Sequence, residues 1–274
     1  VLLADSLHDP RWLFMWLLAF AIFFGLKWLT WRRTRVLSAP WWRHAGYLLF
    51  WPGFDAETFL VATPQRRSPT PHSRELISSV VCFLAGLFLF FVAPGLFPNL
   101  DAYWIGWMGM VGVVLVLHFG SFHALSCLWR SMGVEASPLM VRPVRSSSLS
   151  EFWGERWNTA FRDLTHRYLF IPLSSLLGPR WGIFGGFLMS GLIHDVVISI
   201  PAKGGYGLPT LFFILQAVGF FIERSRWGKR VGLRRHVRGW LFTMAFLAIP
   251  VPLLFHGPFI QNVVLPFMEA MGAR

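Results

Sequence analysis

The stretch RWLFMWLLAFAIFFGLKWLTW, residues 11–31, decides the class of this protein. Between Arg11 and Arg32 its only charged residue is Lys27. An apolar run of about 20 residues is long enough to cross the hydrocarbon core of a bilayer as a helix. The run ends in Trp-Arg-Arg and shows no small-residue cleavage site, which favours a membrane span over a signal peptide. Because the sequence starts at Val1 and not at Met, we expect residues before it.

The composition of the whole chain agrees with a membrane protein. Of its 274 residues, 55% are hydrophobic and 14% are charged, and the mean hydropathy is +0.53. Soluble domains contain about 25% charged residues, and one of this size could not bury so much apolar surface in a single core. The two cysteines, Cys82 and Cys127, fall in apolar stretches, so we expect neither a disulfide framework nor a metal site.

Further segments repeat the pattern of residues 11–31. They are apolar enough to span the membrane and lie at residues 76–98, 103–125, 181–201, 208–223 and 239–257. The last contains Pro250 and Pro252, so we expect a kink or break there. Residues 45–51 and 168–177 are shorter, are followed by Pro-Gly or Gly-Pro, and indicate re-entrant or half-buried pieces. We therefore predict an all-α integral membrane protein, one membrane-embedded domain over residues 1–274, with about six transmembrane helices plus re-entrant and interfacial helices.

The basic residues predict the orientation of these spans. With the N-terminus outside, 22 of the 25 Lys and Arg residues fall on three inner connections, as the positive-inside rule requires. Those residues are Lys27, Arg32, Arg33, Arg35, Arg43, Arg66, Arg67 and Arg74; Arg130, Arg142, Arg145, Arg156, Arg162, Arg167 and Arg180; and Arg224, Arg226, Lys229, Arg230, Arg234, Arg235 and Arg238. The net charge of +12 is spread between apolar stretches, which suits an anionic leaflet and not nucleic acid. We expect the basic loops to be cytosolic.

The inner connection 130–180 is much longer than a turn requires. From Ser150, a candidate N-cap, its aromatic residues recur every three to five positions and can share one face of a helix lying in the membrane interface. Taken alone, this pattern favours an anchoring helix with an aromatic belt over a functional segment. The segment ends at Asn158, whose amide could cap a helix, bond across helices or orient a substrate carbonyl.

His194 is the most informative single residue. It lies well inside the predicted span 181–201, where an ionisable side chain is costly and usually serves a function. Ser190 is one helical turn earlier, whereas Asp195 is adjacent in sequence and cannot share the face of His194. A packing histidine that bonds to a neighbouring helix remains the alternative.

The two segments together resemble the paired signature of membrane-bound O-acyltransferases, in the wax-synthase-like branch. Phe152-Trp-Gly-Glu-Arg-Trp-Asn158 resembles the F-W-G-x-R-W-N stretch of that branch, and Ser190-Gly-Leu-Ile-His194 resembles its S-G-hydrophobic-hydrophobic-H stretch inside a span. Tyr47-Leu-Leu-Phe-Trp-Pro-Gly53 is similar to a stretch upstream of both. The resemblance covers residues 45–200 and is clearest at 149–195.

The resemblance implies a helical fold that encloses a tunnel, with acyl-CoA entering from the cytosol and a hydroxyl-bearing acceptor, a lipid or other alcohol, from the far side. His194 would remove the hydroxyl proton, and Asn158 would orient the acyl carbonyl, the acceptor or His194. Ser190, Asp195 and His123 would surround them. We expect no cofactor besides acyl-CoA as co-substrate. Its phosphates and adenine suit the following basic and aromatic residues: Arg142, Arg145, Arg156, Arg162, Trp153 and Trp157.

Two features depart from the family pattern, and several alternatives stay open. The chain has fewer spans than is usual in this superfamily, and Asp195 stands where a Glu is often found. A non-enzymatic transporter or scaffold would explain the spans but not the two motifs. A di-iron enzyme would need several histidine boxes, and no H-x-x-H-H occurs around His118 and His123. Because Arg outnumbers Lys by 22 to 3, we expect a bacterial inner membrane before endoplasmic reticulum. The oligomeric state is open.

Overall fold

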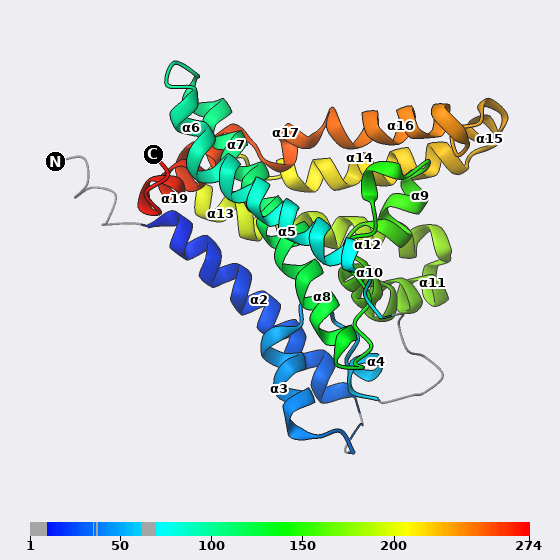
Figure 1. Ribbon diagram of the computed structural model, residues 1–274. Helices are drawn as coiled ribbons and strands as arrows, with labels where there is room; N and C mark the ends of the chain where they lie inside the picture. The colour runs from blue at the N-terminus through cyan, green and yellow to red at the C-terminus, as the bar shows by residue number, and fades with distance from the viewer. Residues whose placement is uncertain (1–9, 35, 37, 62–69) are drawn as a thin grey trace.

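The computed structural model describes residues 10–34, 36, 38–61 and 70–274. Arg35, Arg66 and Arg67, which we assigned to the first basic connection, lie outside the described residues. The described residues form helices and connections and contain no strand (Figure 1). The predicted all-α class is therefore confirmed.

Five helices are long and apolar enough to cross a membrane. They are α2 (Arg11–Arg33), α5 to α6 (Ser73–Leu87 and Ala93–Leu96), α7 to α8 (Ala102–Val114 and Phe122–Ser131), α12 to α13 (Pro179–His194 and Ile200–Ala202), and α16 to α17 (His236–Ala248 and Val251–Leu254). Only 11–22% of the residues in their most apolar windows are buried inside the protein. So much apolar surface is stable only against lipid, which makes this a multi-pass integral membrane protein.

The predicted span 208–223 forms α14 (Leu208–Arg224), which has 17 residues. Its length of about 25 Å is at the lower limit for crossing a bilayer. This helix packs between α12 and α16 (Figure 1). The predicted break at the prolines of the last span is confirmed, because α16 ends at Ala248 and α17 begins at Val251.

Three of the spans contain a π-helical segment of five to seven residues. These segments are Phe88–Val92, Leu115–Ser121 and Asp195–Ser199. A π turn adds one residue to the helical repeat and turns the following side chains to a new direction. The last two flank or contain the histidines described below.

The first inner connection forms α3 (Trp41–Phe50) and α4 (Ala56–Leu60), both too short to span. Lys27, which we counted with this connection, is instead fully buried inside α2. Its Nζ donates a hydrogen bond to the Gly53 carbonyl at 2.6 Å and lies 3.1 Å from the centroid of the Tyr47 ring. Lys27 therefore joins α2 to the connection and does not face the cytosol.

The connection before α12 is not the continuous helix expected from Ser150. It consists of a 3₁₀ turn, three short helices and two π segments: Pro143–Arg145, α9 (Leu149–Glu151), Phe152–Arg156, α10 (Thr159–Thr165), His166–Phe170 and α11 (Ile171–Leu177). The N-cap is Ser148, whose hydroxyl accepts from the Glu151 N–H at 3.0 Å. Asn158 breaks the helix because its φ of 43° is left-handed.

The C-terminal part after α15 (Arg226–Val231) and α16 contains helices that we did not predict. They are α18 (Gly257–Phe259), the π segment Ile260–Val264 and α19 (Leu265–Ala270). They pack on a glycine face of α7: a Cβ on Gly106 would lie 2.4 Å from Ile260, and one on Gly109 would lie 2.2 Å from Met268. α19 also reaches α2, with the Trp12 and Phe267 rings 5.6 Å apart (Figure 1).

Candidate active site

His194 occupies the last turn of α12, directly before the π segment Asp195–Ser199. Its Nδ1 lies 2.7 Å from the Ser190 carbonyl oxygen, and the Ser190 hydroxyl donates to Gly186 at 2.9 Å. A carbonyl oxygen only accepts hydrogen bonds, so Nδ1 must carry a proton. In the neutral ring, Nε2 is then the nitrogen with a free lone pair. Among the described residues Nε2 has no hydrogen-bond partner.

One aromatic side chain contacts His194 directly, and a second contacts it through the first. The Phe213 ring of α14 lies 4.7 Å from the His194 ring, centroid to centroid. Phe213 in turn contacts Trp153 at 5.7 Å. The Trp153 indole N–H donates to the Gln216 side chain at 3.4 Å, and Gln216 is fully buried on α14. The first tryptophan of the FWGERWN segment thus reaches His194 through Phe213.

The FWGERWN segment also contacts His118, which lies on the π segment Leu115–Ser121. The Trp157 ring stacks on the His118 ring at 5.8 Å and on Phe152 at 5.6 Å. His118 lies within electrostatic range of His194. We expected His123, five residues later, among the residues around His194; His123 instead lies by Glu75, and the residue that contacts the FWGERWN segment is His118.

Asn158 caps a helix in this structure. Its Oδ1 accepts from the Phe161 N–H at 3.2 Å, which begins α10. Its backbone N–H donates to the Met140 sulfur at 3.1 Å. Within the described part of the chain, no hydrogen bond joins Asn158 to His194, and the Asn158 amide nitrogen makes none. Asn158 therefore reaches the site through its neighbour Trp157 and keeps a free donor.

Asp195 turns away from His194, as its position in the helix predicts. Its carboxylate accepts from the Ser199 hydroxyl at 2.9 Å, the Gly207 N–H at 2.8 Å and the Thr210 N–H at 3.0 Å, and from the Thr210 hydroxyl. These bonds satisfy free N–H groups at the start of α14. Asp195 thus fixes the helix that presents Phe213 to His194.

Glu223, at the other end of α14, was not identified from the sequence. It is fully buried and accepts from the Leu149 N–H at 2.7 Å, the Ser150 N–H at 2.9 Å and the Ser150 hydroxyl. Glu223 lies at the charged end of a predicted span, where an exposed interfacial residue is equally expected, so the sequence does not show that it is buried. Glu223 anchors the start of the FWGERWN segment to α14.

The four arginines expected to bind acyl-CoA divide into two pairs. Arg156 contacts Glu151 at 2.6 Å and the Val141 carbonyl at 3.1 Å. Arg162 contacts Asp163 and the Gly154 carbonyl, both at 2.5 Å. Both therefore hold the connection together. Arg142 and Arg145 are exposed, and within the described residues their guanidinium groups make no hydrogen bond.

The lowered pKa of Glu151 supports a structural role for Arg156 within this connection. Burial opposes the charge of Glu151, but the hydrogen bonds from Ser147 and Arg156 outweigh it and hold the pKa of that carboxyl below its ordinary value. The carboxylate form of Glu151 is therefore stabilised in the folded protein. The motif arginine and Glu151 form a pair within the loop.

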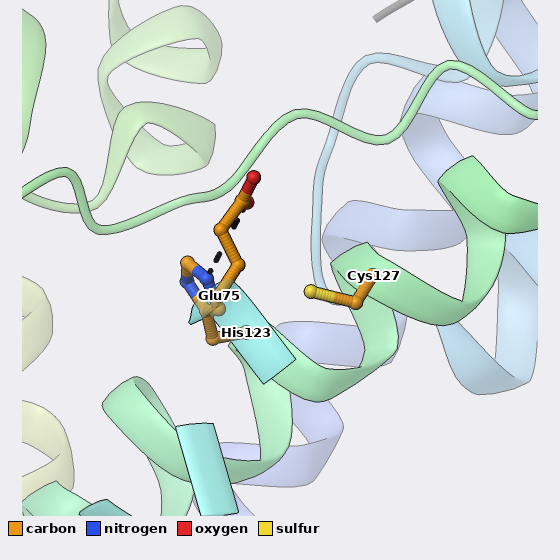
Figure 2. A group of neighbouring side chains, drawn as sticks. All are labelled: Glu75, His123 and Cys127. Carbon is orange, nitrogen blue, oxygen red and sulfur yellow. Dashed lines mark ion pairs between the residues drawn. The ribbon is translucent and has the colours of Figure 1, made fainter. Parts of the chain in front are cut away.

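One cluster has the chemistry of a metal site: Glu75, His123 and Cys127 (Figure 2). One ligand atom from each lies within 4.8 Å of the others, and the Glu75 and His123 side chains are 3.8 Å apart. Nη2 of Arg130, however, lies 2.5 Å from the Glu75 carboxylate and 3.6 Å from the Cys127 sulfur. A guanidinium thus supplies the positive charge that a metal ion would bring, and we assign the cluster no metal.

A cavity of about 540 Å³ lies between α5 and the helix that continues from α7 into α8. Its lining is apolar apart from two serine hydroxyls and consists of Ser79, Val80, Phe83, Gly120, Ser121, Ala124, Leu125 and Leu128. Neither His118 nor His194 lines it. The predicted tunnel that meets His194 stays a prediction.

Comparison with known proteins identifies the region that holds this site. Residues 136–215 match the model of the membrane bound O-acyl transferase family. The match includes both motifs, Phe213 and the residues that Asp195 binds. No solved structure is a significant match to this chain.

Curated relatives that resemble the chain are plant acyltransferases. A probable long-chain-alcohol O-fatty-acyltransferase 7 of Arabidopsis thaliana is 29% identical over 147 residues, which is 48% of this chain and 42% of the relative. A long-chain-alcohol O-fatty-acyltransferase of Simmondsia chinensis is 30% identical over 43% of this chain and 37% of the relative. An acyl-CoA–sterol O-acyltransferase 1 of Arabidopsis thaliana is 32% identical over 23% and 21%. Each alignment spans less than half of the relative's length.

Proposed function

We propose that this chain is a member of the membrane-bound O-acyltransferase family, in its wax-synthase-like branch, and that it transfers an acyl group from acyl-CoA to the hydroxyl of a lipid or other alcohol. The names of its relatives support ester formation on long-chain alcohols or sterols. The same names do not favour the alternative of a non-enzymatic transporter or scaffold.

The hydrogen bond between His194 and the Ser190 carbonyl carries the proposal. It holds the proton on Nδ1 and leaves the lone pair of Nε2 free, which is the state that a general base needs. The His194 ring is half-buried and packs on Phe213, which belongs to the matched region.

The reaction needs proton removal, alignment and support for the oxyanion. The acceptor oxygen attacks the thioester carbonyl carbon, and its proton passes to Nε2 of His194. The carbon–sulfur bond then breaks, and the proton moves on to the departing sulfur, which leaves an ester and free CoA. A thioester already has a good leaving group, so the step requires no further cofactor. Asn158, with its free amide nitrogen, orients the acyl carbonyl.

The binding of acyl-CoA draws on the exposed arginines of the same connection. Arg142 and Arg145 are available for phosphate contacts, since no hydrogen bond described occupies them. Arg156 and Arg162 act indirectly, by holding the loop. Trp157 stacks on His118 and Trp153 contacts Phe213, so both would contact the acyl end sooner than the adenine.

The orientation in the membrane follows the basic residues. We place the loops that carry Arg142 and Arg145 in the cytosol, where acyl-CoA is made available. Composition favours a bacterial inner membrane over endoplasmic reticulum, although the relatives described are plant proteins.

The proposal predicts that His194→Ala abolishes ester formation. Purified protein in lipid nanodiscs is incubated with acyl-CoAs of varied length and a panel of long-chain alcohols and sterols, and both released CoA thiol and ester are measured. Removing the base should lower kcat about 100-fold or more. His166→Ala, which removes an exposed histidine of the same connection, should keep the wild-type rate.

Two results would contradict the proposal. The first is a folded wild-type protein that forms no ester with any donor and acceptor pair. The second is His194→Ala protein with the wild-type rate, which would leave the enzyme activity but remove His194 as its base.

A further inference from the structure

We infer that His118 is a second residue of this site that touches substrate, and that its ring N–H donates a hydrogen bond to the acyl carbonyl oxygen. The inference deepens the proposed function and rests on it. Neither motif contains His118, and it lies outside the matched region 136–215.

The hydrogen bonding of His118 is incomplete. Its Nδ1 is shielded from solvent and has no hydrogen-bond partner. The Val114 carbonyl, one turn earlier, interacts with the ring but does not complete a hydrogen bond to Nδ1. An unsatisfied buried polar atom costs about 1–3 kcal/mol. Such a group in a native protein requires an explanation, of which a catalytic role is one, and a neutral imidazole always has one N–H to offer.

The location of His118 points to the reacting end of the substrate. The ring lies in electrostatic range of His194 and stacks on Trp157, the neighbour of Asn158, at an interplanar angle of 14°. Two segments far apart in sequence therefore meet at this ring, the third span and the FWGERWN segment. His118 lies on the π segment Leu115–Ser121, and π turns inside α-helices are frequent at functional sites.

The charge that His194 acquires decides whether His118 acts as a second base or as a hydrogen-bond donor. When His194 accepts the hydroxyl proton it becomes a cation, and a second cation in electrostatic range would be repelled. His118 is therefore best kept neutral through the reaction. A neutral imidazole N–H can polarise a carbonyl and stabilise the oxyanion that forms. His194 would thus remove the proton of the acceptor hydroxyl, and His118 would donate a hydrogen bond to the carbonyl oxygen of the acyl-CoA.

The test compares three substitutions of His118 in the nanodisc-embedded protein. His118→Phe keeps a ring for stacking on Trp157 but removes both nitrogens. His118→Asn and His118→Gln each keep one amide N–H, near the place of Nδ1 or of Nε2. We measure kcat and KM for acyl-CoA, with the thermal unfolding midpoint of each variant. His166→Phe serves as the control for loss of a histidine outside the site.

We expect His118→Phe to lower kcat about 100-fold or more, as loss of one oxyanion donor does, with KM for acyl-CoA changed less than about threefold. One of the two amide variants should regain about tenfold of the loss. Wild-type kcat in His118→Phe would overturn the inference, and so would an equal loss in all three variants. If the wild type and His118→Phe make ester equally well, the inference on His118 fails and the proposed function stands. If the wild type makes no ester, the proposed function itself fails.

Discussion

Glu223 shows at the residue scale how the site depends on residues outside both motifs. Its buried carboxylate receives two N–H groups and a hydroxyl from Leu149 and Ser150, and Arg234 lies 4.0 Å away. Glu223→Gln would turn an amide nitrogen toward these donors and leave at least one unsatisfied, at about 1–3 kcal/mol. For a chain of this size the unfolding midpoint should fall by roughly 2–4 °C per kcal/mol.

The measurement is thermal unfolding in detergent, followed by tryptophan fluorescence. Glu269→Gln is the matched control, because Glu269 is exposed at the end of α19. Equal midpoints for Glu223→Gln and wild type would show that the buried carboxylate does not anchor the FWGERWN segment.

Individual site residues could be predicted only in part. His194 was recognisable because an ionisable residue deep in a span is costly, and Asn158 was found to cap a helix, one of the three roles left open. His118 was not chosen over His123, since an ideal helix does not reveal the π segment Leu115–Ser121 that sets their directions. His123 instead pairs with Glu75.

At the scale of elements, the turn between α12 and α14 is closed by a single carboxylate. Asp195→Ala removes the acceptor of the Gly207 and Thr210 N–H groups, and loss of such a cap costs about 0.5–2 kcal/mol. We expect faster amide exchange at residues 207–211 and a lower kcat, because Phe213 is no longer held against His194. Hydrogen-exchange mass spectrometry and the ester assay measure the two effects.

A matched cap exists on a distant helix. Asp101 accepts from the Tyr103 N–H at 2.8 Å at the start of α7. Asp101→Ala should speed exchange there and leave kcat unchanged. If both variants lose activity equally, the effect of Asp195 is general destabilisation and not the placement of α14.

The elements themselves followed from apolar run length, charged ends and prolines, to within a few residues for α2 and for the continuous helix from α12 through α13. The C-terminal helices α18 and α19 did not. These helices are short and each has a proline near its start, so their sequence does not resemble a span. Their apolar residues instead pack on the glycine surface of α7. Such helices exist because of tertiary contacts, which a single sequence does not show.

At the scale of the whole molecule, the basic connections predict opposite sides for the two ends of α14. Tyr206 and Trp227 are exposed aromatic residues before and after it. In a protein with Cys82 and Cys127 replaced by serine, we introduce Tyr206→Cys or Trp227→Cys and label intact cells with a membrane-impermeant maleimide. Tyr206→Cys should react in intact cells, and Trp227→Cys only after lysis. Reaction of both on one side would show that this helix of 17 residues does not cross.

The overall class of the molecule was the easiest property to predict, because a membrane demands long apolar runs wherever the chain crosses. The assignment of basic residues to the inner connections was less exact, since Lys27 is buried inside the protein on α2. Assembly of the site was beyond reach, because it depends on pairs far apart in sequence such as Trp153 with Gln216.

The bond between Ser150 and Glu223 sets a time order for biosynthesis. The two residues are 73 positions apart, so at about 5–20 residues per second the ribosome adds Glu223 roughly 4–15 s after Ser150. During that interval the FWGERWN segment has no acceptor for its first N–H groups, even after His194 has been made. The site can close only once α14 has been inserted, and a nascent chain stalled before Glu223 would carry both motifs in an open form.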